Sequence, residues 1–153
     1  MSSYHYASKI EVQFRDCDPL GHVNNAVYIT YFEIARFAYC RDALGFTIED
    51  AVGSESFIMA RVECNFRSQA RLGDRLDVRI RVSEIGRSSF QFEYEIVQAA
   101  DGRLVADGKS VQVSFDYKAQ RSIPVPESFR AKVERFEQTT FARPTPAPAA
   151  PTA

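Results

Sequence analysis

The sequence has few cysteines and no long apolar segment. Its 153 residues include only three cysteines, Cys17, Cys40 and Cys64, and none of them forms a Cys-x-x-Cys pair. This odd number predicts neither a disulfide framework nor a zinc knuckle, so we expect three reduced packing residues. The uninterrupted apolar stretches are only a few residues long, whereas a span of a bilayer needs roughly 20. The start of the chain also lacks the apolar region of a signal peptide, so we expect a cytoplasmic protein without a membrane span.

An excess of charge of either sign is also missing. The chain carries 19 basic and 20 acidic residues, for a net charge of -1. General nucleic-acid binding relies on surplus Lys and Arg, so we expect no nucleic-acid partner. The basic residues are unevenly placed, however, because seven of the 15 arginines lie in residues 61–87, with four acids. That stretch is either a solvated sheet face or a site for a small phosphorylated ligand, since guanidinium groups bind phosphate bidentately.

Several motifs of known chemistry are absent. No two glycines form Gly-x-Gly, which excludes the dinucleotide fingerprint and the Walker-type phosphate loop. The Gly-x-Ser-x-Gly nucleophile elbow is missing as well. A calcium loop beginning at Asp16 would need an acid or amide at Leu20 and Glu at Val27. We therefore expect neither a metal ion nor an organic cofactor.

The composition that is present describes one domain. With 45% apolar and 25% charged residues, a chain of this length can bury a core without metals or disulfides. We assign residues 1–142 to that domain, with a core over about 8–118 and a terminal helix over about 127–138. Residues 143–153 form a tail rich in Pro and Ala, which we expect to be disordered or extended.

Alternation of apolar and polar residues predicts an antiparallel sheet. Five segments place apolar side chains on one face and mostly polar ones on the other, which is typical of strands with one wet face. Turn signals at 73–74, 86–87 and 101–102 separate the later segments. The apolar positions are Ile10, Val12 and Phe14; Val62, Cys64 and Phe66; Leu76, Val78, Ile80 and Val82; Phe90, Phe92, Tyr94 and Ile96; and Val111, Val113, Phe115 and Tyr117.

Residues 25–44 instead have the period of a helix, with Asn24 or Asn25 as N-cap and Gly45 after its end. Four polar side chains share an arc of roughly 140°, which leaves about 220° apolar. An amphipathic helix on a flat sheet needs only about a 100° apolar stripe, so we expect a sheet curled around this helix, helped by a partner subunit. The polar positions are Thr30, Glu33, Arg36 and Arg41.

Reactive side chains gather in one segment just before that helix, from Asp16 to Asn25. Pro19 holds Asp18 in an extended or turn conformation, and Gly21 permits an unusual backbone angle. The segment therefore lies at a helix N-terminus, where free N–H groups can bind an anion or polarise a carbonyl oxygen. Taken singly, each residue also has an ordinary explanation as a turn, capping or surface residue.

Taken together, these residues resemble a family signature. Asp16-Cys-Asp18-Pro-Leu-Gly21-His22-Val-Asn24-Asn25, followed by Tyr28, is similar to the signature of the 4-hydroxybenzoyl-CoA thioesterase-like branch of hotdog-fold acyl-CoA thioesterases. Residues 66–74 and 86–90 also resemble the family's middle strands. The resemblance implies an α+β hotdog fold, in which a curved five- to six-stranded antiparallel sheet wraps around one long central helix.

The resemblance also implies roles for residues. Asp18 would be the catalytic carboxylate, as nucleophile or general base, and helix-start amides near Asn24 and Asn25 would polarise the thioester carbonyl. His22 would orient water or complete the turn, and Asp16 would position the substrate. Coenzyme A, as part of the substrate, and an acyl chain between helix and sheet would be bound at an interface of a homodimer or homotetramer. The implied binding residues are Asp16, Gly21, Tyr28, Phe57, Arg71, Arg87, Ser88 and Ser89.

Two other functions remain open from the sequence. One is a non-catalytic module that binds acyl-CoA or an acyl carrier protein, which has no need of a carboxylate beside the thioester. The other is a hotdog enoyl-CoA hydratase or dehydratase, which usually relies on a His with an acid placed deeper along the helix. The leading prediction is hydrolysis of an acyl-CoA thioester to a free acid and coenzyme A, with a substrate on carrier protein as a variant.

Overall fold

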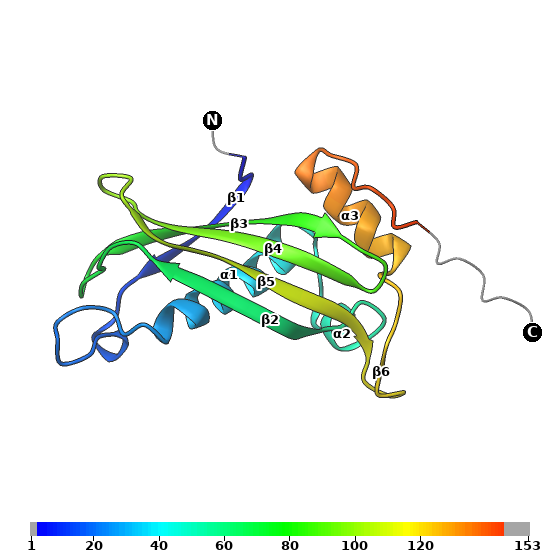
Figure 1. Cartoon of the computed structure of the whole chain (residues 1–153), viewed down its shortest axis with the longest axis horizontal. Coiled ribbons are helices and arrows are strands. Elements are labelled where there is room, and N and C mark those ends of the chain that lie inside the picture. The colour runs from blue at the N-terminus through cyan, green and yellow to red at the C-terminus, as the bar shows by residue number, and fades with distance from the viewer. Residues whose placement is uncertain (1–2, 146–153) are drawn as a thin grey trace, which may run out of the picture.

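A computed structural model describes residues 3–145, in which a curved antiparallel sheet lies over one long helix (Figure 1). The predicted α+β architecture is therefore confirmed. Besides a short 3-10 helix over Phe14–Asp16, the elements are β1 (Tyr6–Glu11), α1 (Val27–Asp42), α2 (Ile48–Val52), β2 (Phe57–Phe66), β3 (Arg75–Ile85), β4 (Ser89–Gln98), β5 (Leu104–Asp116), β6 (Arg121–Ser122) and α3 (Glu127–Glu137).

The strands follow the order β1-β3-β4-β5-β2, with β6 paired to β5. All these pairs are antiparallel, and tight turns connect β3 to β4 and β4 to β5 where Gly86 and Gly102 were expected to mark them. The second strand in the chain thus pairs with the fifth, which leaves β1 and β2 at the two edges. β2 is the longer edge strand, with ten residues against six.

The first predicted strand is too long at its C-terminal end. Val12 is buried, and its backbone amide donates to the Asp74 carbonyl oxygen at 2.9 Å. The chain then leaves the sheet as a 3-10 helix, so Phe14 is 84% exposed rather than on the buried face. The alternation continues two residues beyond the last backbone pairing, which is why the pattern alone misplaced Phe14.

The central helix is shorter and differently oriented than predicted. It begins at Val27. Asn24 Oδ1 accepts the Ala26 amide at 3.0 Å, and the Asn24 carbonyl oxygen accepts the Val27 amide, so of the two asparagines Asn24 caps the turn that leads into the helix. Arg36 belongs to the buried side, whereas Ile34 and Phe37 are 45% and 62% exposed. The sheet of one chain covers one side of α1 rather than the whole apolar arc. No helix within residues 3–145 has the length and apolar character needed to cross a membrane.

The helix is fixed to the sheet where Phe32 meets β4 and β5. The Phe32 ring stacks on Tyr94 with centroids 4.2 Å apart, and neither side chain exposes more than 1% of its surface. Directly beside the ring, β5 has Gly108, where an added Cβ would lie 2.8 Å from Phe32 Cε2 and also against the Glu63 carbonyl oxygen. Gly108 therefore permits the close approach of α1 to the sheet.

The terminal helix α3 is joined to the rest by a buried carboxylate. Glu137 Oε1 accepts the Tyr39 hydroxyl at 2.6 Å and the Val82 amide at 3.1 Å. This carboxylate thereby links α3 to α1 and β3. The first residue of the predicted tail, Arg143, pairs with Glu127 at 2.6 Å, while residues 146–153 of that tail lie outside the described residues.

We expect Gly108→Ala to be one of the most destabilising single substitutions in this chain. The added methyl would force the Phe32 ring or the β2 backbone to move, and overpacking of this kind typically costs about 1–3 kcal/mol or more. Urea unfolding monitored by circular dichroism measures the loss. Gly102→Ala is the control, because Gly102 has φ +74° and an added Cβ would meet no atom within 4 Å, so this variant has backbone strain but no steric overlap. Equal stability of Gly108→Ala and the wild type would contradict the steric argument.

Candidate active site

The segment that joins β1 to α1 forms a tight loop that gathers the predicted catalytic side chains. The Asp18 amide donates to the His22 carbonyl oxygen at 3.0 Å, and the Gly21 amide returns to the Asp18 carbonyl oxygen at the same distance. Gly21 has φ +86°, a left-handed conformation that favours glycine. The loop is therefore ordered by its own backbone before any ligand binds.

The Asp16 side chain connects the start of this loop to α1 through hydrogen bonds. Its Oδ2 accepts the Gln13 amide at 2.9 Å and the Tyr31 hydroxyl at 2.9 Å. Burial, followed by the hydrogen bond to Asp16, raises the pKa of Tyr31 well above its usual value. Tyr31 thus remains a protonated donor at neutral pH and connects the loop to the first turns of α1.

The Asp18 carboxylate is half-buried and only partly used by the loop. Its Oδ1 accepts the Leu20 amide at 2.9 Å, in the local turn that Pro19 favours. Its Oδ2 accepts no hydrogen bond from residues 3–145. One carboxylate oxygen is therefore held by the backbone, and the other is available to a ligand or water.

The two asparagines differ in what they leave available. The Asn24 amide donates to the Asp16 carbonyl oxygen at 2.9 Å, and Asn24 Oδ1 accepts the Ala26 amide at 3.0 Å. Asn24 is therefore part of the loop's own bonding. The Asn25 amide, just before α1, has no acceptor among residues 3–145. Of the two amides expected to polarise a carbonyl oxygen, only that of Asn25 is available.

Other predicted residues adjoin the loop. The Val23 amide donates to the Ala70 carbonyl oxygen at 2.9 Å, which brings the exposed Arg71 to this end of the molecule. His22 Nδ1 lies 3.3 Å from the Val23 carbonyl oxygen. Tyr28 is 4% exposed, and its ring contacts Phe66 with centroids 5.6 Å apart.

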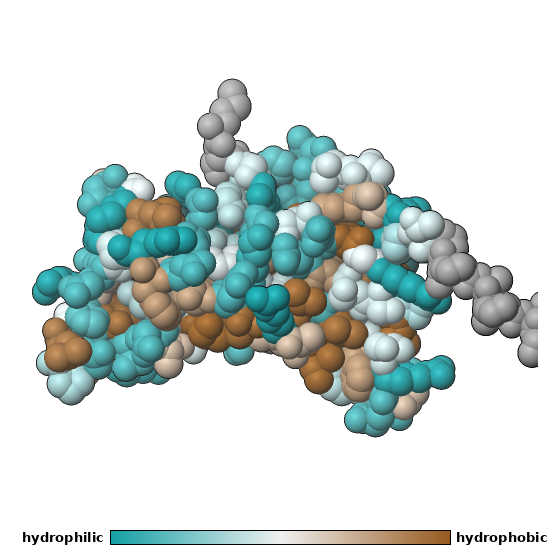
Figure 2. Space-filling view, viewed as in Figure 1, coloured by the Kyte–Doolittle hydropathy of each residue, from teal (hydrophilic) through white to brown (hydrophobic). Residues whose placement is uncertain are grey.

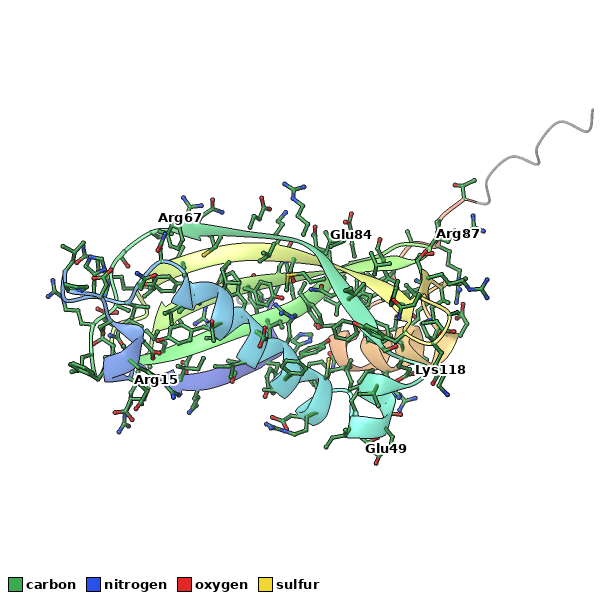
Figure 3. All side chains as sticks on the ribbon, turned by 90° about the horizontal axis from the view of Figure 1, so that it is seen from below. Arg15, Glu49, Arg67, Glu84, Arg87 and Lys118 are labelled. Carbon is green, nitrogen blue, oxygen red and sulfur yellow. The ribbon has the colours of Figure 1, made fainter. Side chains whose placement is uncertain are left out.

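The remaining four predicted residues, Phe57 and Arg87 to Ser89, lie at the other end of the sheet. Phe57 pairs with Ser114, whose amide donates to the Ser88 carbonyl oxygen at 2.8 Å. Strand β3 separates this end from the loop, a distance of roughly 30 Å for its length. Figure 3 shows Arg15, beside the loop, and Arg87 at opposite ends of the molecule. One chain therefore does not bring these four residues to Asp18.

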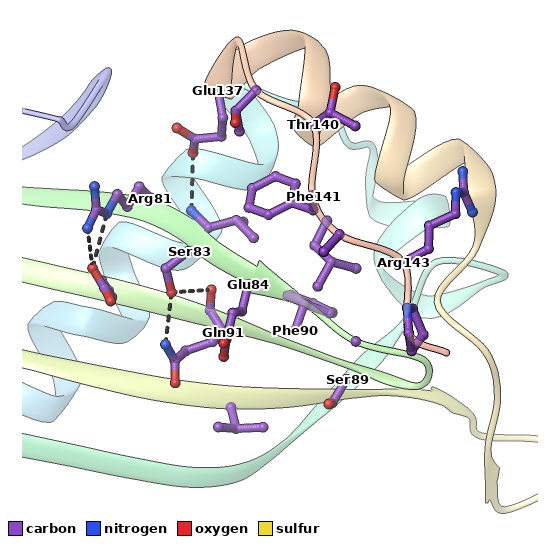
Figure 4. Close-up of a pocket in the computed structure, with 18 of the residues that line it drawn as sticks. Arg81, Ser83, Glu84, Ser89, Phe90, Gln91, Glu137, Thr140, Phe141 and Arg143 are labelled. Atoms are coloured by element: carbon purple, nitrogen blue, oxygen red, sulfur yellow. Dashed lines mark hydrogen bonds and ion pairs between the residues drawn. The ribbon is translucent and has the colours of Figure 1, made fainter. Parts of the chain in front are cut away.

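A cavity of about 940 Å³ also lies away from the loop, between the segment after α3 and the outer face of β3 and β4 (Figure 4). Its lining includes Ser83, Gln91, Phe141 and the predicted binding residue Ser89. None of the predicted residues of the loop, nor Tyr28 or Arg71, lines it.

Two residues of this region were missed or misread in the sequence. The role of Tyr31 as the donor to Asp16 depends on a contact between residues 15 apart, which alternation and helical period do not encode. Arg36 was placed on the polar arc but is 7% exposed and donates to the Tyr94 hydroxyl at 3.2 Å. No cluster of three or more His, Cys, Asp or Glu side chains within residues 3–145 could hold a metal ion.

Comparison with known proteins defines the class of this chain. The family profile of the thioesterase-like superfamily matches residues 12–133. The chain therefore belongs to that superfamily, and it is a thioesterase with the hotdog fold expected from the loop signature.

Several relatives cover nearly the whole chain. A thioesterase from Thermus thermophilus, solved in complex with coenzyme A and Zn, is 33% identical, covers 92% of this chain and 100% of its own, and superposes with a TM-score of 0.80. The long-chain acyl-CoA thioesterase FadM of Escherichia coli K12 is 27% identical over 84% of this chain and 97% of its own length. The chloroplastic acyl-acyl carrier protein thioesterase ATL3 of Arabidopsis thaliana is 28% identical over 89% of this chain and 70% of its own.

We expect Tyr31→Phe to loosen the loop, because it leaves Asp16 without its side-chain donor. The loss of one hydrogen bond to a carboxylate should lower the free energy of unfolding by about 1–3 kcal/mol. Tyr117→Phe is the matched control, since its hydroxyl donates to the Phe57 carbonyl oxygen at 3.3 Å on an exposed surface. Urea unfolding of both variants gives the comparison, and equal stabilities would show that the Tyr31 hydroxyl does not anchor the loop.

Proposed function

We propose that this thioesterase hydrolyses acyl-CoA thioesters to a free carboxylic acid and coenzyme A, with Asp18 as the catalytic carboxylate. The observation that carries the proposal is the free Asp18 oxygen in the same closed loop that ends at the unpaired Asn25 amide. A carboxylate and a preorganised N–H donor are the two groups that thioester hydrolysis needs.

In the general-base form of the reaction, Asp18 removes a proton from a water molecule while the oxygen of that water attacks the thioester carbonyl carbon. The carbonyl oxygen becomes an oxyanion that the Asn25 amide stabilises, a contribution typically worth about 3–4 kcal/mol per donor. The C–S bond then breaks, and the thiolate of coenzyme A takes up the proton. In the nucleophilic form, an Asp18 oxygen attacks the carbonyl carbon, the C–S bond breaks, and coenzyme A leaves as a thiolate. Water then hydrolyses the resulting mixed anhydride to the free acid and the Asp18 carboxylate, and the proton released goes to the thiolate.

His22 has a supporting role in this scheme. With Nδ1 donating to the Val23 carbonyl oxygen, Nε2 is left as an acceptor that can orient the attacking water. Asp16 is a positioning residue in this scheme, since its Oδ2 accepts both the Gln13 amide and the Tyr31 hydroxyl and thereby fixes the loop to α1.

The names of the relatives support the acyl-CoA class. FadM is named for long-chain acyl-CoA, and the Thermus protein was crystallised with coenzyme A. ATL3 is named for acyl groups on carrier protein, so this carrier is the second substrate to test. A hydratase would need an acid placed deeper along the central helix. The acids of α1 are Glu33, whose side chain is 58% exposed, and Asp42 at its end, so this function is less well supported.

The complete site requires a second copy of the chain. Strand β2 is an unpaired edge of ten residues, and two of its side chains, Ile58 and Phe66, are 42% and 54% exposed. Figure 2 shows apolar surface along the lower edge of the molecule, where β2 runs in Figure 1. An exposed edge of this kind pairs readily with another strand, and a two-fold axis would pair β2 with itself.

Pairing of β2 with its own copy would bring together the binding residues that lie at opposite ends of one chain. When a ten-residue strand pairs antiparallel with its own copy about its midpoint, its first residue lies opposite its last. Phe57 of the partner subunit would then face Phe66, which contacts Tyr28 beside the loop. The same rotation brings the end that carries Arg87, Ser88 and Ser89 towards Arg71, where basic and hydroxyl groups suit the phosphates of coenzyme A. A homodimer or a homotetramer would contain this pair.

We expect Asp18→Ala to lower kcat for acyl-CoA hydrolysis by about 10² to 10⁴, because the general base or nucleophile is lost. Release of coenzyme A thiol, followed with a chromogenic disulfide, measures it across short, long, branched and aromatic acyl groups.

The control for this substitution is Asp101→Ala. Asp101 Oδ1 accepts the Arg103 amide at 2.9 Å, the same local turn that Asp18 makes with Leu20, so both variants lose an equivalent backbone contact. Full activity in folded Asp18→Ala would refute the assignment. Tight binding without thiol release in the wild type would instead favour the non-catalytic module.

We expect the double variant Ile58→Lys with Ala60→Lys to be monomeric, since lysines on an edge strand oppose strand pairing. Light scattering should give twice the 17.3 kDa chain mass for a wild-type dimer and one chain mass for the variant. Activity should fall by about tenfold or more because the composite site is disassembled. Val52→Lys, at a 72% exposed apolar residue of α2, is the control. A fully active monomeric wild type would refute the composite site.

A further inference from the structure

The inner side of α1 carries a buried arginine that the proposed reaction does not use. The Arg36 side chain is 8% exposed, and its Nη1 donates to the Tyr94 hydroxyl at 3.2 Å. Within residues 3–145, the nearest carboxylate is that of Glu33, 4.0 Å away and 58% exposed. A guanidinium has five N–H donors in a planar fork. This one therefore has donors and a positive charge that the chain itself satisfies only in part.

The groups beneath Arg36 are polar but neutral. The Tyr94 hydroxyl lies 2.5 Å from Ser110 Oγ, and Gln112 Nε2 donates to Ser110 Oγ at 2.9 Å. All three side chains are at most 1% exposed. The network extends across the inner faces of β4 and β5 without an acid. A buried cation is costly unless an anion compensates it, so this arrangement is suited to an incoming negative group.

Arg36 lies on the side of α1 that faces the sheet, about two and a half turns beyond the start of the helix. Tyr28 contacts Phe66 at one end of β2, whereas Lys132 contacts both the Phe46 ring, just after α1, and Glu55, just before the other end of β2. The helix therefore runs antiparallel to β2. The inward residues of this edge strand are only half-buried, so a single chain leaves them partly accessible to solvent or to a ligand; they are Phe57, Met59, Val62 and Cys64.

The distance between Arg36 and the start of α1, where the catalytic loop ends, determines how long a ligand must be to contact both places. Arg36 is nine residues beyond the first residue of α1, which corresponds to about 13 Å along the axis. An extended chain advances about 3.5 Å for every three bonds, so roughly ten bonds connect the two places. An acyl chain of medium length with its thioester carbonyl at the start of α1, beside the Asn25 amide, would place its far end beside Arg36.

We propose that Arg36 is a specificity-determining residue that binds a carboxylate at the far end of the acyl chain, so that the preferred substrates are ω-carboxyacyl thioesters of medium length. The inference rests on the proposed acyl-CoA thioesterase function. A carboxylate matches the guanidinium fork bidentately and neutralises its charge. A methyl-ended chain would place an apolar group beside the guanidinium and would accept none of the N–H donors that Glu33 and Tyr94 leave open.

The test compares thioesters that differ only at the far end. Mono-CoA thioesters of dicarboxylic acids with six to twelve carbons are assayed against methyl-ended acyl-CoA of equal length and against the ω-methyl esters. We expect the wild type to favour the carboxylate over the methyl end by about 10- to 100-fold in kcat/KM at its best length, as charged hydrogen bonds allow. The kcat/KM of the neutral ω-methyl ester should lie between the values for the carboxylate-ended and the methyl-ended thioesters.

Variants then assign the preference to Arg36. Arg36→Met, of similar length without charge, should lower this ratio by about tenfold or more, mainly through KM, and Arg36→Lys should retain part of it. Arg41→Met is the matched control on the same helix, because Arg41 is exposed and pairs with its neighbour Asp42. It should leave the ratio unchanged. Free octanedioate should also inhibit the wild type more strongly than octanoate does.

The outcomes separate this inference from the function on which it rests. Asp18-dependent hydrolysis that is as fast or faster for methyl-ended chains at every length overturns the role of Arg36 and leaves the thioesterase function intact. A carboxylate preference that persists in Arg36→Met also overturns it. The absence of hydrolysis of every thioester refutes the proposed function, and this inference with it. The wild-type comparison is valid even where a variant does not fold.

Discussion

The position of α1 depends on the contact of Phe32 with Tyr94 and with the bare backbone of Gly108. A stacked aromatic pair gains from its orientation as well as from burial, but it forms here only because no side chain on β5 separates the helix from the sheet. Tyr28, one turn before this contact, and Tyr31, the residue directly before Phe32, lie beside the catalytic loop. One turn after it, Arg36 reaches the hydroxyl of the same Tyr94 on which Phe32 stacks. The depth of the helix thus determines both ends of the proposed acyl path.

The loop and the binding residues illustrate two ways of building a site. The loop is local: its carboxylate, its amide and its glycine lie within ten residues, and backbone hydrogen bonds order it in a single chain. The residues suited to coenzyme A are distributed along a strand, at both of its ends. Such residues meet only if two antiparallel copies lie edge to edge, because a two-fold axis exchanges the ends of a strand. In the proposed assembly, catalytic groups come from one chain and part of the ligand contacts from the other.

The sequence predicts those features of the structure that have a short period or a local cause. The positions of the strands follow from alternation, and the hairpins follow from glycines that permit tight turns. The predicted face of β5 is wrong, however, because its buried residues are Ser110, Gln112 and Ser114, whereas Val111, Val113 and Phe115 are only half-buried. Phe14 was misplaced because the alternation continues beyond the last backbone pair. Arg36 was misplaced because a helical pattern is interpreted from the polarity of its residues. A charged side chain is then assigned to the solvent-exposed face unless its buried partner is known. The partner, Tyr94, is 58 residues away and belongs to a different element. Long-range contacts of this kind are also what joins Asp16 to Tyr31.

The buried carboxylate of Glu137 bears on how much of the chain is needed to fold. The strands and the central helix end well before residue 127, and the alternating pattern predicts a core that finishes near residue 118. Yet the Tyr39 hydroxyl and the Val82 amide, both within that core, have their acceptor on the last residue of α3. A chain shortened to the sheet and its helix would lose the acceptor of both donors as well as the helix that covers them, so we expect the unit that folds stably to extend through Glu137.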